Sequence, residues 1–157
     1  WVIITMADGS DDPEDMISYA YQMEKGYDCC FGTRWKGKGL TRNYPLHKLV
    51  LNRFANWFIQ LLFGIRYNDT TNAFKCYSRD TIMGINPIIS YHFNLTVELP
   101  IKAIIRGYSY SVIPTYWYGQ KTGLSSLKIH EMGSRYLFIL LYLWLEKFLS
   151  RGDYRKK

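Results

Sequence analysis

The sequence predicts an α/β fold in which helices flank a mostly parallel β-sheet. Short apolar runs alternate along the chain with segments of helical periodicity, and this alternation is the pattern of parallel sheets. The 157 residues are 48% hydrophobic and 21% charged, which is enough apolar material for one globular unit with a core. No internal repeat, low-complexity tract or Gly/Ser-rich linker divides the sequence.

The first three elements follow from the opening residues. WVIITM at 1–6 is a continuous apolar run, which indicates a buried strand. Asp12 followed by Pro13 is typical of a helix start, so a helix is expected over 13–25. YDCCFG at 27–32 is a second apolar run and indicates a second strand.

A basic loop at 33–43 leads into a long helix at 44–63, and a loop at 64–72 follows it. Apolar residues recur in the helix at helical spacing, so we expect it to pack a wide apolar face inward. The residues of this face are Leu46, Leu49, Val50, Phe54, Trp57, Phe58, Leu61 and Leu62.

The second half of the chain repeats the alternation. AFKCYS at 73–78 indicates a strand, a turn-rich stretch follows, and the apolar segment 93–106 indicates a helix. A strand is expected at 108–114, a loop at 115–126 and a further helix at 129–149, before a basic tail.

Charge and cysteine content restrict the partners and the compartment. Twenty Lys and Arg against 13 acidic residues give a formal net charge of +7 and a pI near 9.3. An anionic partner is therefore expected: a nucleotide, a phospholipid surface or a nucleic acid. No recognised nucleic-acid motif is present, and the aromatic residues follow core periodicity, so we expect no nucleic-acid partner. Three cysteines, two of them adjacent, cannot form a disulfide framework, which favours a reducing compartment.

The acidic segment MADGSDDPED, at positions 6–15, is unusual in a basic chain. A helix start accounts for Asp12, Glu14 and Asp15, whose carboxylates would complement free backbone amides. A calcium-binding loop counted from Asp8 is excluded, because Tyr19 stands where the bidentate Glu belongs. Asp8 follows the apolar strand, and ligands of open α/β sheets bind at the carboxyl ends of strands. Asp8 is therefore a candidate binding residue.

The basic loop and the helix after it form a candidate phosphate-binding region. Arg34 and Arg42 lie in the loop, and Lys48, Asn52 and Asn56 form a polar stripe at i, i+4 and i+8 on the helix. Cationic side chains at the start of a helix suit phosphate oxygens. A solvated helix face is the alternative explanation of the stripe.

The aromatic C-terminal segment is a candidate for membrane contact. Its uninterrupted apolar stretch, 136–145, is too short to cross a bilayer, which takes about 20 residues. A helix followed by Arg151, Arg155 and Lys156 is typical of a segment that lies on an anionic membrane surface or leads into further segments. A buried helix with a solvated basic tail is the alternative.

Five motifs occur in the order and at the spacing of one enzyme family. They are ADGSDDPED, GTR at 32–34 with the basic loop and helix, DTTNAFKCYSRD at 69–80, FNLTVELPIKAIIRGYSYSVIP at 93–114 and GQKTGLSSLKI at 119–129. Together they resemble the family-2 glycosyltransferases of the polyprenyl-phosphate sugar synthase, or dolichol-phosphate mannosyltransferase-like, type. The resemblance implies a GT-A type nucleotide-diphospho-sugar transferase fold. It divides the chain into a C-terminal portion of the catalytic domain, 1–130, and an amphipathic, membrane-interfacial helix with a basic tail, 131–157.

The start of the chain adds a further expectation. Trp1 lies inside a strand-like run without an initiator Met. The family usually carries an earlier strand of the nucleotide-binding fold. We therefore expect that the first strands are missing from this sequence and that residues 1–157 alone are inactive.

The resemblance implies a metal site with a catalytic role. Asp8 matches the last carboxylate of an Asp-x-Asp motif that holds Mg²⁺ or Mn²⁺ on the diphosphate of the sugar nucleotide. Met6 replaces the first Asp of that motif, and Asp11 and Asp12 are close enough in sequence to serve as further ligands.

The resemblance also assigns the two substrate phosphates. Arg34 and Lys48 are expected to act in catalysis by holding the acceptor phosphate, in a group made of Arg34, Arg42, Lys48 and Asn52. Gln120 and Lys121 fall where the family binds the donor diphosphate.

Asp69, Lys75 and Glu98 are candidates to orient sugar hydroxyls or a basic side chain, and Lys75 also to screen the repulsion between two anionic substrates. For Glu98 the alternative is an ion pair with Lys102 four residues later, worth about 0.2 to 0.5 kcal/mol on an isolated helix.

The implied reaction moves a hexose from GDP-mannose or a UDP-hexose to a polyprenyl phosphate, dolichyl or undecaprenyl, with inversion, at the cytoplasmic face of a membrane. The phosphate nucleophile is already an anion near neutral pH, so no strong general base is expected. Two other interpretations stay open: a family-2 glycosyltransferase with a polysaccharide or other acceptor, and a non-catalytic membrane-surface module.

Overall fold

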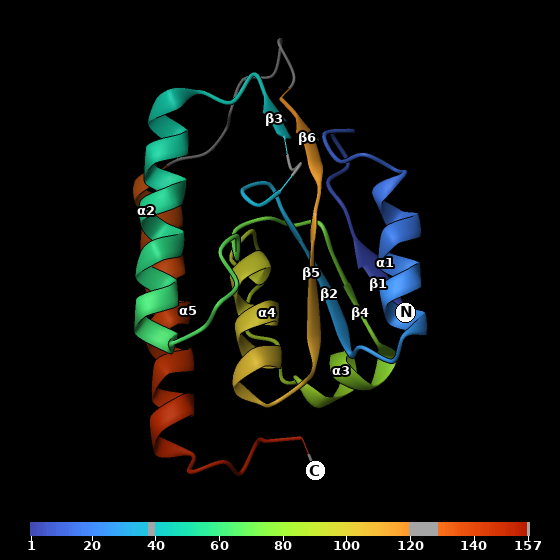
Figure 1. Cartoon of the computed structure of the whole chain (residues 1–157). Coiled ribbons are helices and arrows are strands. Elements are labelled where there is room, and N and C mark those ends of the chain that lie inside the picture. Colours follow the sequence, from blue (N-terminus) through green and yellow to red (C-terminus); the bar gives the residue numbers. More distant parts are fainter. Residues whose placement is uncertain (38–39, 120–128, 157) are drawn as a thin grey trace.

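The computed structural model describes residues 1–37, 40–119 and 129–156. Its centre is a four-stranded sheet in the order β1 (Val2–Ile4), β4 (Lys75–Tyr77), β2 (Cys29–Thr33) and β5 (Tyr110–Pro114). Helix α1 (Asp15–Glu24) lies on one face of this sheet and α4 (Leu95–Ile105) on the other (Figure 1). Helices α2 and α5 form an outer layer beyond α4 (Figure 1). A mixed α/β fold with flanking helices, as the sequence predicted, is therefore confirmed.

The main sheet is mixed rather than mostly parallel. Its strands are β1 (Val2–Ile4), β2 (Cys29–Thr33), β4 (Lys75–Tyr77) and β5 (Tyr110–Pro114). Strands β2 and β5 are parallel, but β4 lies between β1 and β2 and is antiparallel to both. The expectation of a mostly parallel sheet is wrong, because residues 69–72 are bound to the carboxyl end of β2 and β4 therefore starts where β2 ends.

Each face of the sheet is covered by one helix. On one face, Tyr19 and Met23 of α1 (Asp15–Glu24) pack against Cys30, Phe74, Cys76 and Ile113. On the other, Leu99 and Ala103 of α4 (Leu95–Ile105) pack against Cys29, Phe31 and Tyr77. Neighbouring residues of β2 pack on opposite faces of the sheet because side chains alternate along a strand. All three cysteines are buried and none forms a disulfide.

The outer helices present apolar side chains to the outside. Helix α2 (Leu46–Phe63) buries Asn56, Ile59 and Phe63, and α5 (Ile129–Leu149) buries Ile139, Leu140 and Leu143. The expected inward packing of the α2 apolar face is wrong, because most of that face is exposed. The large exposed apolar residues are Leu46, Val50, Leu51, Phe54, Trp57, Phe58 and Leu61 on α2, and Leu137, Phe138, Leu141, Leu145, Phe148 and Leu149 on α5. We call these side chains the outer apolar face.

Three short elements lie in segments that the sequence predicted as loops or turns. Strand β3 (Leu40–Arg42) pairs in parallel with β6 (Tyr116–Tyr118), and α3 (Arg79–Gly84) follows β4. The β3–β6 pair joins positions far apart in the chain, so the local pattern does not reveal it. Within the described ranges, no helix is long and apolar enough to cross a bilayer.

Candidate functional site

A buried ion pair stands at the carboxyl end of β2. The Asp69 carboxylate accepts hydrogen bonds from Nε and Nη2 of Arg34 at 2.9 and 2.7 Å, and from the Arg34 backbone N–H at 2.9 Å. Asp69 is fully buried and Arg34 is 7% exposed. Bidentate pairing of this kind fixes the guanidinium in one orientation.

Aromatic rings enclose the other side of the Arg34 guanidinium. Its central carbon lies 5.3 Å from the Trp35 ring and 5.8 Å from the Tyr44 ring, and Trp117 of β6 packs on Tyr44. Burial on its own would lower the pKa of Arg34, but the Asp69 carboxylate outweighs it and raises that pKa above the usual value. The Arg34 guanidinium therefore remains charged throughout the physiological range.

The polar stripe of α2 holds the loop that carries Asp69. Asn56 is 1% exposed, and its Oδ1 accepts from the backbone N–H and the hydroxyl of Thr70 at 2.6 and 2.8 Å. Nδ2 of Asn52 donates to the Thr71 hydroxyl at 2.7 Å. The alternative of a solvated stripe is excluded for Asn56. Lys48, one turn earlier on α2, is half-buried.

Lys75 lies beneath this loop as the first residue of β4 and is 1% exposed. Burial lowers the pKa of Lys75 to about 7, the nearby Asp69 carboxylate opposes this, and the Arg34 cation adds to it. The site thus contains the Arg34 guanidinium, the Lys75 amine and the Asp69 carboxylate in close proximity, all withdrawn from water.

The acidic segment lies at the end of β1. Asp8 is exposed, and its carboxylate accepts from the backbone N–H of Ser10 at 3.0 Å. Asp11 is 8% exposed and accepts from the Thr5 hydroxyl at 3.0 Å and the Met6 N–H at 2.9 Å. Burial raises the pKa of Asp11, although these two hydrogen bonds act against it. Asp12 accepts from the N–H of Glu14 at 3.0 Å.

At this edge Asp8 offers a divalent ion one exposed carboxylate rather than a preformed cage of protein ligands. The described residues contain no group of three or more His, Cys, Asp or Glu side chains that could hold a metal ion. Mg²⁺, however, is commonly bound by one or two carboxylates together with substrate phosphates and waters. An exposed Asp8 at the carboxyl end of a strand suits that mode.

The remaining predicted residues lie elsewhere. Glu98 is fully buried in α4, where it accepts from Lys102 at 2.6 Å and from the N–H groups of Ile89 and Ser90, so the alternative ion pair does form. Arg42 is exposed on β3. Gln120 and Lys121 lie outside the described residues.

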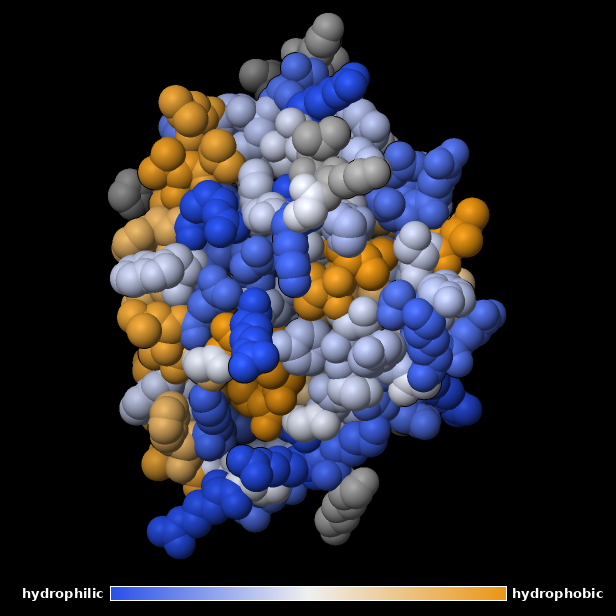
Figure 2. Space-filling view, viewed as in Figure 1, coloured by the Kyte–Doolittle hydropathy of each residue, from blue (hydrophilic) through white to orange (hydrophobic). Residues whose placement is uncertain are grey.

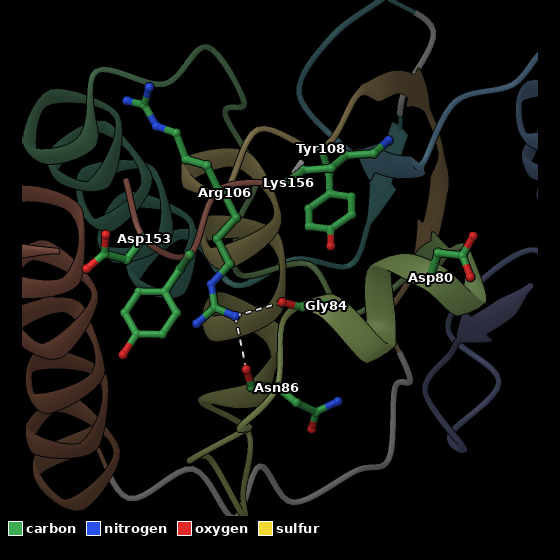
Figure 3. Close-up of a pocket in the computed structure, with 9 residues that line it drawn as sticks. Asp80, Gly84, Asn86, Arg106, Tyr108, Asp153 and Lys156 are labelled. Atoms are coloured by element: carbon green, nitrogen blue, oxygen red, sulfur yellow. Dashed lines mark hydrogen bonds between the residues drawn. The ribbon is translucent and has the colours of Figure 1, made fainter. Parts of the chain in front are cut away.

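A cavity of about 450 Å³ lies at the other end of the molecule, between α3 and the C-terminal residues (Figure 3). The Arg106 guanidinium that lines it donates to the carbonyls of Gly84 and Asn86 and to Glu146. Lys156 nearby binds Asp28 at 2.8 Å. These contacts anchor the C-terminal residues, so we assign this cavity no ligand.

Sequence reasoning did not identify the roles of Trp35, Tyr44 and Thr71 at the site. Trp35 and Tyr44 enclose Arg34, and Thr71 joins the loop to α2. The one available signal was the pair of asparagines, Asn52 and Asn56, on a helix rich in apolar side chains. Two side-chain amides four residues apart lie on the same face of a helix, where they can form hydrogen bonds with a neighbouring loop as well as with water.

Comparison with known proteins gives two informative relatives. The chain is 28% identical over 129 residues to a polyprenol monophosphomannose synthase of Mycolicibacterium smegmatis, a match that covers 80% of this chain and 49% of the relative. It is 22% identical over 123 residues to glycosyltransferase AglJ of Haloferax volcanii, covering 78% of this chain and 40% of the relative. No protein-family description matches the chain.

The predicted resemblance is confirmed: the chain is similar to glycosyltransferases of the polyprenyl-phosphate sugar synthase kind. The chain spans about half the length of these relatives, or less. The activity of the whole protein is therefore a matter for proposal.

Proposed function

We propose that this protein is a glycosyltransferase that moves a hexose from a nucleotide-sugar to a polyprenyl phosphate. The observation that carries the proposal is the buried Arg34–Asp69 pair at the carboxyl end of β2, which unites two of the motifs behind the family resemblance. Similarity to a polyprenol monophosphomannose synthase supports the choice of acceptor.

The reaction needs no strong base. A phosphate oxygen of the lipid attacks the anomeric carbon of the sugar, the bond from that carbon to the diphosphate oxygen breaks, and the nucleoside diphosphate leaves with the electron pair. Attack opposite the leaving group inverts the anomeric carbon. The main barrier is the approach of two anions, so cations fixed in place before the reaction are the principal aid.

Arg34 and Lys48 are proposed to hold the acceptor phosphate, with Arg42 and Asn52 beside them. Asp69 accepts from Nε and Nη2 of Arg34, and we assign Nη1 to the phosphate. The bidentate pair keeps the Arg34 guanidinium from rotating away, which preserves its position between turnovers.

We propose Mg²⁺ or Mn²⁺ as cofactor, held by Asp8 and the donor diphosphate, with Asp11 and Asp12 next to it in the chain. A divalent ion there would neutralise the charge that gathers on the leaving diphosphate. Asp8 would supply a fixed carboxylate at the carboxyl end of β1.

We further propose that the outer apolar face rests on the cytoplasmic surface of a membrane. Figure 2 shows apolar side chains gathered along the edge of the molecule formed by α2. Soluble monomers rarely expose a large contiguous apolar surface, whereas a helix with one apolar side can lie in the membrane interface. Lys147 and Arg151 at the end of α5 would meet anionic headgroups.

A transfer assay with labelled donors tests the proposal. The full-length protein is incubated with GDP-[¹⁴C]mannose or UDP-[¹⁴C]glucose, a divalent ion and either dolichyl or undecaprenyl phosphate. We expect label in the organic phase from one of the donors, and little or none with Asp69→Asn. Label that enters only a water-soluble polymer, or no transfer from any donor, would overturn the proposed acceptor.

A further inference from the structure

The ammonium of Lys75 binds three backbone carbonyls. Nζ donates to the oxygens of Thr70 at 3.0 Å and Thr96 at 3.1 Å, and to that of Asn72. An ammonium has three donors, so the charged side chain is fully used. Two of its acceptors belong to the loop 69–72 and the third to α4.

Pro100 explains why the Thr96 carbonyl of α4 can accept a hydrogen bond from outside the helix. In an α-helix the Thr96 carbonyl would accept from the N–H of residue 100, but proline has no N–H. The Lys75 ammonium supplies the missing donor from outside the helix. Lys75 thereby links the loop to the first turn of α4, whose Val97 is buried in the hydrophobic core.

The residues of this loop are in turn bound to the site. Asp69 binds Arg34, the backbone N–H of Thr70 donates to Oδ1 of Asn56, and Nδ2 of Asn72 donates to the carbonyl of Gly32 at 3.2 Å. A change in the position of the loop would therefore move the Asp69 carboxylate and, with it, the guanidinium.

We propose that Lys75 is a positioning residue: its ammonium, by binding the carbonyls of Thr70, Asn72 and Thr96, keeps the Arg34–Asp69 pair in the arrangement that glycosyl transfer requires, and loss of its proton releases that arrangement. The transfer step itself rests on the function proposed above. Lys75 does not contact either substrate in this proposal.

Within the described part of the chain, few charged or titratable groups face Lys75. Asp69 lies in the loop, Arg34 at the end of β2 and Asp11 before α1, and the Tyr67 ring centroid is 5.7 Å from Nζ. Helix α4 offers the Thr96 carbonyl. A neutral amine has only two N–H donors, so deprotonation leaves one of the three carbonyls without a partner.

The pH dependence of stability and of activity should have opposite signs for this group. The pKa of Lys75 is about 7 in the folded protein, because of burial, against an ordinary value of 10.5. Between these two values the unfolded chain binds a proton that the folded protein lacks, so Lys75 makes the free energy of unfolding rise with pH. Transfer, in contrast, should fall as pH rises through about 7.

The first experiment measures kcat for transfer to polyprenyl phosphate between pH 5.5 and 9 in the full-length protein. We expect kcat of the unmodified protein to fall towards tenfold per pH unit above about 7. Lys75→Arg keeps a permanent cation and should lose this alkaline limb, whereas Lys75→Met, which lacks the cation, should stay at about one hundredth of the maximal kcat of the unmodified protein at every pH. An alkaline limb that is unchanged in Lys75→Arg would overturn the proposal.

Lys102→Arg is the matched control. Lys102 is also a fully buried lysine, but it binds Glu98 and the carbonyl of Pro87, away from Arg34 and Asp69. This variant should keep the alkaline limb of the unmodified protein. Loss of the limb in both variants would mean that any buried Lys-to-Arg change abolishes it, which also counts against Lys75.

A second measurement needs neither a variant nor activity. NMR of the protein labelled at lysine Cε and arginine Nε should show one lysine that titrates near pH 7 and an Arg34 Nε–H signal that shifts at the same midpoint. This result would support the positioning role even if the protein transferred no sugar. Failure of the positioning proposal can therefore be distinguished from failure of the proposed function. Lysines that all titrate above about pH 9.5, or an Arg34 signal indifferent to the transition, would refute it.

Discussion

Breaking the Arg34–Asp69 pair from one side should destabilise the protein strongly, and removing both charges together should cost clearly less than the two single changes added. Asp69→Asn leaves the Arg34 cation 7% exposed and without its carboxylate. Removing one partner of a buried pair costs about 3 to 5 kcal/mol of the free energy of unfolding. We expect about the same cost for Arg34→Met. In the double variant neither member of the pair is left as an unpaired charge, and the Asn oxygen can still accept from the backbone N–H of residue 34.

Urea unfolding followed by far-UV circular dichroism measures these free energies. The cost of the double variant should fall short of the sum of the single costs by about 2 kcal/mol or more, as expected for directly coupled residues. Lys156→Met is the control, because it breaks an ion pair whose lysine is 43% exposed, and such pairs contribute about 0 to 1 kcal/mol. Additive costs, or a loss in Asp69→Asn no larger than in the control, would refute the reasoning.

Three further outcomes are expected in the full-length protein. Asp8→Asn should lower metal-dependent transfer by about 100-fold or more with little change in unfolding free energy, because a divalent ion contributes several kcal/mol to such a step; activity that survives both this change and EDTA would contradict the metal role. Lys48→Ala should raise the apparent KM for lipid phosphate roughly tenfold, because it deletes one charged hydrogen bond; an effect confined to the donor KM would instead assign Lys48 to the diphosphate. Phe54→Glu should weaken binding to anionic vesicles about tenfold in a sedimentation assay, because it removes a large apolar side chain from the contact. Ile17→Glu, which changes an exposed apolar residue on α1, should not, and equal losses in both would argue against the outer apolar face (Figure 1).

The sequence was most informative where local pattern and fold agree. The runs that became β2 and β5 and the helical periodicity of α2 and α4 located these elements, because strand and helix periods are properties of neighbouring residues. The direction of β4 is not such a property. It depends on the bonds that hold residues 69–72 at the end of β2, which join distant parts of the chain.

Helix α2 shows the limit of periodicity most clearly. The sequence divides the helix into an apolar side and a polar side but does not say which side faces inward. The usual rule turns the apolar side in. Here Asn56 is buried against Thr70 while Phe54 and Trp57 are 61% and 56% exposed. The rule fails because a polar loop, and not an apolar sheet, lies against this part of the helix.

The site could be predicted as a set of residues but not as a set of contacts. Asp69, Arg34 and Lys75 were each candidates, assigned to sugar or phosphate. The bidentate pair and the three carbonyls around Lys75 depend on tertiary structure that spacing does not encode.

The most direct test of the central claim is the structure of the reaction product. Lipid recovered from a reaction of the full-length protein with its preferred nucleotide-sugar is analysed by ³¹P and ¹H NMR. The account predicts a phosphodiester that joins the polyprenyl chain to the sugar, with the anomeric configuration opposite to that of the donor. A sugar attached to a hydroxyl group with no phosphodiester signal, or an anomeric carbon of retained configuration, would contradict it.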